Sequence, residues 1–103
     1  MGNFFKEIQQ LGKGIGTASR YRILESLLKG SLTVSEIVKK VKLSQPSVSQ
    51  HLKTLKACQL VTDEKRGKEV FYSVNVSHMA ELLKHFSTDI NKCPKQAAKN
   101  LKL

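Results

Sequence analysis

Two short amphipathic segments separated by only a few residues constrain the fold of this chain more than any other feature. Residues 33–36 read Thr-Val-Ser-Glu, a capping box in which the threonine hydroxyl and the glutamate carboxylate satisfy backbone amides at the start of a helix. Ser44 is suited to cap a second helix, with Pro46 tolerated in its first turn. The apolar stripe of that second helix is Val48, Leu52 and Leu55. Because little more than Lys42 and Leu43 connects the two helices, the segment predicts a helix-turn-helix.

Apolar residues at three- and four-residue steps predict three further helices. Near the start of the chain the stripe is Phe4, Phe5, Ile8, Leu11 and Ile15, and this helix should fade near Gly14 because glycines also stand at 12 and 16. Between Ser19 and Lys29 the stripe is Tyr21, Ile23, Leu24, Leu27 and Leu28, and Gly30 is suited to end the helix. The last stripe is Met79, Leu82, Leu83, Phe86 and Ile90. We therefore expect about five helices.

A charged β-hairpin is predicted directly after the helix-turn-helix. Residues 62–68 are polar with Gly67 near the tip, and Val70, Tyr72 and Val74 then alternate with other residues as in a strand. A helix-turn-helix followed by a basic hairpin is the winged-helix arrangement. The expected fold is therefore mostly α with a β-hairpin wing, in one domain over residues 1–91. Residues 92–103 are basic and weakly patterned, with Pro94 among them, and we expect them to be a mobile tail.

The charge of the chain favours a polyanionic partner. It carries 18 Lys and Arg against 8 Asp and Glu, a net charge of +10, which fits nucleic acid or an anionic membrane surface. Residues 39–68 hold eight Lys or Arg and two acids, so a net +6 lies on the helix-turn-helix and the wing. No apolar run approaches the length of a membrane span, and residues 1–16 lack a secretory pattern. We expect a cytoplasmic protein without a membrane partner.

The second helix of the helix-turn-helix resembles a known family. Residues 43–52 read Leu-Ser-Gln-Pro-Ser-Val-Ser-Gln-His-Leu, followed by Leu55, Leu60 and Val61, and this run closely resembles the ArsR/SmtB regulators. Residues 70–72, Val-Phe-Tyr, resemble the second wing strand of the same family. The resemblance covers about Ser19 to Ile90. It implies a bacterial dimeric repressor that releases DNA when a metal, metalloid or thiol oxidant binds, with the first and last helices forming the dimer.

Helical spacing independently favours DNA binding. If the apolar stripe faces the core, Gln50 and its neighbours turn outward, and glutamine offers the donor and acceptor pair that matches adenine in the major groove. Serines can bond base edges or phosphates, and basic residues at the wing tip can reach backbone phosphates. We therefore expect these residues to contact double-stranded operator DNA: Ser44, Gln45, Ser47, Ser49, Gln50, His51, Lys53, Thr54, Lys65, Arg66 and Lys68.

Several of these features have a structural alternative. His51 lies beside the apolar stripe, which favours packing or a phosphate contact over base reading or metal ligation. Lysines around a helix are commonly a solvated face. Phe4, Phe5, Phe86 and Ile90 fit an ordinary core as well as a homodimer interface.

Neither established metal site of the resembled family is intact. Residues 31–37 read Ser-Leu-Thr-Val-Ser-Glu-Ile, with hydroxyls at Thr33 and Ser35 where the family has thiolates, and hydroxyls are poor ligands for soft metals. The pattern on the last helix retains only one of four ligands. His78, His85 and Asp89 nevertheless share one side of that helix and, opposite a partner helix, could hold zinc or nickel. The alternative is a polar helix flank without a ligand.

Oxidation of the two cysteines is a second candidate signal for release from DNA. Cys58 fits a small core residue, and Cys93 follows the last helix, so a thiol switch depends on a geometry that sequence does not give. An enzyme is disfavoured because the chain has no phosphate-cradling glycine loop and no nucleophile beside a base. The prediction is a DNA-binding transcriptional repressor. The alternative is a winged-helix module that docks protein without specific DNA recognition.

Overall fold

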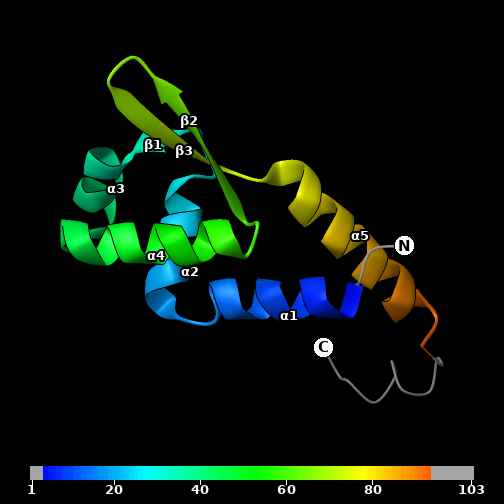
Figure 1. Cartoon of the computed structure of the whole chain (residues 1–103). Helices are drawn as coiled ribbons and strands as arrows, with labels where there is room; N and C mark the ends of the chain where they lie inside the picture. The colour runs from blue at the N-terminus through cyan, green and yellow to red at the C-terminus, as the bar shows by residue number, and fades with distance from the viewer. Residues whose placement is uncertain (1–3, 94–103) are drawn as a thin grey trace.

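The computed structural model describes residues 4–93 and has the winged helix-turn-helix fold, mostly helical with a three-stranded sheet (Figure 1). In chain order the elements are α1 (Phe4–Ile15), α2 (Ala18–Ser26), β1 (Leu32–Thr33), α3 (Val34–Val41), α4 (Gln45–Ala57), β2 (Val61–Arg66), β3 (Glu69–Val74) and α5 (Val76–Asn91). The expectation of five helices and a hairpin wing is confirmed. The predicted tail falls mostly on residues 94–103, which lie outside the described residues.

The core lies between α2, α3, α4 and the base of the wing. Its buried members are Ile23, Leu24, Leu27, Ile37, Val41, Val48, Leu52, Leu55, Cys58, Leu60 and Val61. The predicted stripe of α4 is thus confirmed. For α2 the prediction is partly wrong, because Tyr21 is 52% exposed and Leu28 is 68% exposed. The helix ends at Ser26, before Gly30, since the amides of Leu27 and Leu28 bond three residues back and tighten the chain into turns.

The capping box predicted for the helix-turn-helix is present. The Thr33 hydroxyl accepts from the Glu36 amide at 3.3 Å, and a Glu36 carboxylate oxygen accepts from the Thr33 amide at 2.9 Å. These contacts lower the pKa of the Glu36 carboxyl below its ordinary value, first through the backbone hydrogen bond and then through that from the hydroxyl. The start of α3 is therefore fixed by its own sequence.

The wing is larger by one strand than the sequence predicts. The sheet order is β1-β3-β2, with β2 and β3 forming the hairpin around Gly67, whose φ is 64°. β1 pairs with β3 in antiparallel register, Leu32 opposite Tyr72 and Thr33 opposite Phe71. Two residues are too few for an alternating pattern, so sequence reasoning missed β1. Its effect is to join the wing directly to the start of α3.

The two terminal helices extend away from this body and lie against each other (Figure 1). In α1 the one buried residue is Gly14, and in α5 it is Leu82. Large apolar side chains on these helices remain exposed, namely Phe5, Ile15, Val76, Leu83, Phe86 and Ile90. The apolar stripes of both helices therefore lie largely outside the core of the subunit. None of the helices within residues 4–93 combines the length and the apolar character that crossing a bilayer needs.

Candidate DNA-binding surface

Helix α4 presents a polar face beside the apolar stripe that anchors it. Ser44 caps the helix, and its hydroxyl accepts from the Ser47 amide at 3.3 Å, so its acceptor lone pair already has a structural use. Outside the core, the structure leaves exposed Gln45, Pro46, Ser49, Gln50 and Lys53, and leaves half-buried Ser47, His51 and Thr54. A row of small hydrogen-bonding groups on a firmly packed helix can meet base edges without a large side chain in the way.

The wing tip carries two kinds of cation. Lys65 and Lys68 are exposed at the tip of the wing. Arg66 is held: its Nε donates to Glu64 Oε1 at 2.5 Å, and its guanidinium carbon lies 4.7 Å from the centre of the Phe71 ring. The sequence pattern treated the three residues alike. In the structure Arg66 alone of the three pairs with a carboxylate and lies over an aromatic ring of the wing.

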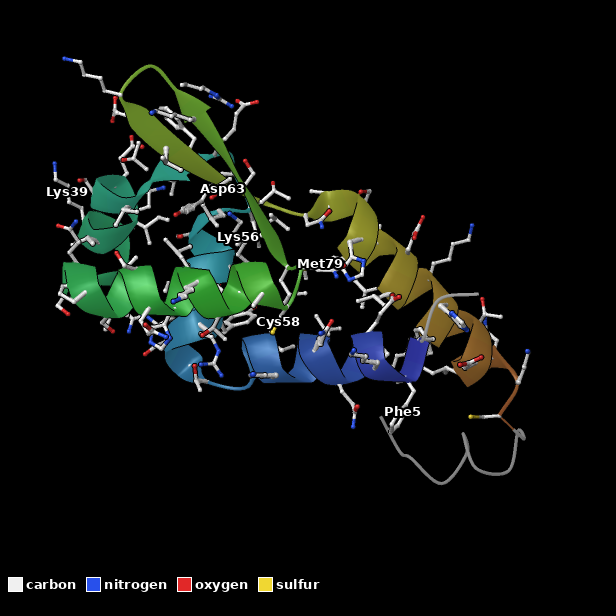
Figure 2. All side chains as sticks on the ribbon, in the orientation of Figure 1. Phe5, Lys39, Lys56, Cys58, Asp63 and Met79 are labelled. Atoms are coloured by element: carbon white, nitrogen blue, oxygen red, sulfur yellow. The ribbon has the colours of Figure 1, made fainter. Side chains whose placement is uncertain are left out.

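An ion pair joins the end of α4 to the wing. Lys56 Nζ donates to Asp63 Oδ2 at 2.9 Å, and Figure 2 shows the two side chains lying toward each other between α4 and β2. The hydrogen bond to Asp63 and its charge raise the pKa of Lys56 above the ordinary lysine value. The pair joins the last turn of α4 to the first strand of the wing hairpin, a contact that helical spacing alone does not indicate.

The turns at both ends of α4 each contain a residue in the left-handed region. Lys42, in the turn between α3 and α4, has φ 57° and its amide bonds the Val38 carbonyl. The Val41 carbonyl beside it accepts from Arg22 of α2. After α4, Gln59 has φ 64°, and the amides of Gln59 and Leu60 bond the carbonyls of Lys56 and Leu55. This is a Schellman motif with glutamine where glycine is usual.

The residues considered for a metal site are not brought together within the chain. His85 stacks on Phe4, with ring centroids 3.7 Å apart and 19° between the planes. His78 Nε2 is buried without a hydrogen-bond partner, and Asp89 is exposed. Across residues 4–93, His, Cys, Asp and Glu form no group of three or more that could hold a metal ion. A zinc or nickel site shared with a second chain stays a prediction.

The two cysteines lie in different surroundings. Cys58 is buried in the core at the end of α4, as expected for a small packing residue, and Cys93 is exposed after α5. Both are free thiols in this chain. A thiol switch through them also stays a prediction.

Comparison with known proteins agrees with this geometry. Residues 17–63 match the family model described as bacterial regulatory protein, arsR family. The transcriptional repressor SdpR of Bacillus subtilis (strain 168) is 31% identical over 80 residues, which cover 78% of this chain and 89% of the repressor.

Two solved structures show the same fold. HlyU from Vibrio cholerae N16961 has 34% identity and a TM-score of 0.67, and the match covers 84% of this chain and 97% of that one. The homodimeric winged helix-turn-helix DNA-binding domain Mb0332 from Mycobacterium bovis has 22% identity and a TM-score of 0.70, over 85% of this chain and 82% of that one. With the helix-turn-helix, the three-stranded wing and the matched residues in agreement, this chain belongs to the arsR family of bacterial regulatory proteins.

Proposed function

We propose that two copies of this chain form a repressor that places the polar face of α4 in successive major grooves of an operator. The observation that carries the proposal is the exposed row of Gln45, Ser49, Gln50 and Lys53 on a helix whose opposite face is locked into the core. A rigid helix with short polar side chains suits base reading, whereas a protein-docking face is richer in apolar anchors. The relative SdpR is named as a transcriptional repressor, which supports the direction of the effect.

A homodimer supplies the second reading helix. One short helix discriminates poorly, and two-fold proteins read paired half-sites about one helical turn apart. The exposed apolar residues of α1 and α5 offer a surface for a second copy, and the similar domain Mb0332 is described as homodimeric. DNA binding and dimerisation then both lie within residues 1–91, and the protein acts on the chromosome in the bacterial cytoplasm.

The candidate contacts divide into two roles. Gln50 and Ser47 read bases, with Gln45, Ser49 and Thr54 beside them. Lys65 and Lys68 of the wing, together with Lys53, contact phosphates and add affinity on any sequence. Ser44 acts through the cap of α4, His51 contacts a phosphate at the edge of the helix, and Arg66 contributes with a charge that Glu64 already partly balances.

The test begins with selection of bound duplexes from a random DNA pool by the full chain. An inverted repeat is expected. On that duplex Gln50→Ala should weaken binding by about 1–3 kcal/mol, with little loss on random DNA. Lys68→Ala should weaken both alike and flatten the salt dependence by roughly one unit per subunit. Lys84→Ala, an exposed lysine of α5, is the matched control and should change neither.

Two results would contradict the proposal. Recovery of no common sequence, with weak and uniform binding, would favour the protein-docking alternative. Equal losses from Gln50→Ala on the selected duplex and on random DNA would remove Gln50 from base reading.

A further inference from the structure

The contact of α1 with the rest of the subunit is closest at Gly14. A Cβ atom placed on Gly14 would lie 2.1 Å from Leu60 Cδ1 and 3.4 Å from Leu55 Cδ2, far closer than ordinary packing for the first of these. A Cβ atom placed on Gly12, about half a turn earlier, would have nothing within 4 Å. The close approach of α1 to Leu55 and Leu60 therefore depends on the absence of a side chain at Gly14.

The atoms beneath Gly14 belong to α4 and to the turn that joins α4 to the wing. Leu60 is fully buried and is the last residue of the Schellman motif that links α4 to the wing, and Leu55 is in the apolar stripe of α4. Because both side chains are enclosed by the core, neither can swing aside freely. By contrast Gly14 is the one buried residue of α1, whose Leu11 packs only partly buried against the core, so a displacement falls more on α1 than on the enclosed Leu60.

Arg20 fixes α1 at the same place. Its Nε donates to the Gly14 carbonyl at 3.0 Å, and its terminal nitrogen donates to the Lys13 carbonyl at 2.7 Å. These are carbonyls of the last turn of α1, and the Lys13 carbonyl also accepts from the Gly16 amide at 3.4 Å. Arg20 also stands in the first turn of α2, where its amide bonds the capping Thr17 hydroxyl at 3.1 Å. One side chain thus ties α1 to the first helix of the body.

The opposite end of α1 is attached to α5 instead. Phe4 stacks on His85 of α5 with ring centroids 3.7 Å apart. A displacement at the Gly14 end therefore changes the angle between α4 and the pair of helices α1 and α5, which carries the exposed apolar surface.

We propose that Gly14 and Arg20 are positioning residues that set the separation of the two reading helices in the dimer, and so the half-site spacing that the protein selects. This inference rests on the dimeric function proposed above. Moving an added Cβ from 2.1 Å to an ordinary carbon–carbon contact of about 3.5–4.0 Å displaces α1 against Leu60, and two-fold symmetry applies the displacement in both subunits. The rise of DNA is about 3.4 Å per base pair, so the combined shift is a sizeable part of one step.

The experiment compares affinities for three duplexes: the inverted repeat selected by the wild type, and versions with one base pair inserted or removed between the half-sites. Gly14→Ala should reduce the preference for the selected spacing over the longer one by about tenfold, a change like that from one mismatched base pair. Gly12→Ala, on the same helix without a contact, should keep the wild-type ratio. Gly14→Ala combined with Leu60→Val, which lacks the Cδ1 atom, should restore it.

Arg20→Gln provides an independent measurement, since it removes the two bonds to α1 without adding volume. Arg20→Gln should reduce the preference for the selected half-site spacing, while sedimentation should still show a dimer. If Gly14→Ala does not fold, the affinity ratios of Arg20→Gln test the inference alone. A purely structural role would lower affinity for all three duplexes equally, and an unchanged ratio in a folded Gly14→Ala or Arg20→Gln dimer would overturn the inference. Failure of the wild type to select a repeat would instead refute the proposed function.

Discussion

Lys56 of α4 and Asp63 of β2 form an ion pair, with 2.9 Å between Nζ and Oδ2, across the junction of the reading helix and the wing. The pair places a carboxylate beside the surface that meets phosphates in the proposed complex. It therefore lowers the positive charge of the surface at the point where helix and wing meet. The pair therefore reduces the sequence-independent attraction to DNA phosphates at this junction, and it leaves the polar face of α4 unchanged.

Asp63→Asn should consequently strengthen binding to random DNA and weaken discrimination. Removal of the carboxylate leaves the Lys56 ammonium available for a phosphate, so the salt dependence should steepen by roughly one unit per subunit. The measurement is affinity for random and selected duplexes over a range of salt concentrations. Asp89→Asn makes the same charge change on α5 and is the control. A salt dependence that matches the control would show that Lys56 stays away from DNA.

Phe86→Glu should convert the dimer to monomers. Phe86 is 49% exposed on α5, and each copy buried in an interface contributes about 1.5–3 kcal/mol, while a buried carboxylate adds a desolvation cost. Sedimentation at micromolar concentration measures the result. Leu28→Glu changes an apolar residue that is still more exposed but lies after α2, and it should remain a dimer. Dissociation of both variants, or of neither, would contradict an interface built from α5.

Gln59→Gly should raise the free energy of unfolding by up to about 1 kcal/mol, because glycine adopts the left-handed conformation without steric cost. Gln59→Val should lower it by about 1–3 kcal/mol, since a β-branched side chain is strained there. Lys53→Gly in the interior of α4 should cost about 1 kcal/mol and shows that glycine is not stabilising everywhere. Chemical denaturation at fixed protein concentration measures all three. A loss of stability in Gln59→Gly would mean that the glutamine side chain is itself needed.

Glu36→Gln should reduce the loss of stability in acid. The pKa of the Glu36 carboxyl is lowered in the folded protein, so its stabilisation is complete above the unfolded value of about 4.3 and is lost as the pH falls through the folded pKa. Glutamine can still accept at this position of a capping box but does not titrate. Thermal unfolding from pH 7 to pH 3 should therefore show a shallower acid limb for the variant. Identical limbs would assign acid sensitivity to other carboxyls.

Local signals in the sequence predict much of the fold. The capping box at Thr33, the cap at Ser44 and the apolar stripe of α4 are contacts among residues close in the chain, and the structure confirms each of them. The apolar period predicts an end of α2 beyond Leu28, whereas the chain turns after Ser26 and leaves Leu28 exposed. β1 depends on a partner strand far along the sequence, which no local pattern records.

The candidate surface was predicted less completely than the fold. Sequence spacing shows which side of α4 faces outward, and the exposed Gln50 and Lys53 agree with it. It does not show pairing between side chains on different elements. Arg66 lies over Phe71 and Lys56 pairs with Asp63, and both contacts form only when the hairpin folds back onto itself or onto α4.

Thr33 belongs to a strand of the wing sheet and to the start of a helix at the same time. It is the last residue of β1, paired with Phe71 of the wing, and it is also the cap of α3. The wing tip, through Arg66 on Phe71, is thereby coupled to the first helix of the helix-turn-helix without an intervening hinge. The wing and α3 therefore share one backbone position, without a connecting loop between them. In the proposed complex, a change that displaced α3 would displace the base of the wing with it.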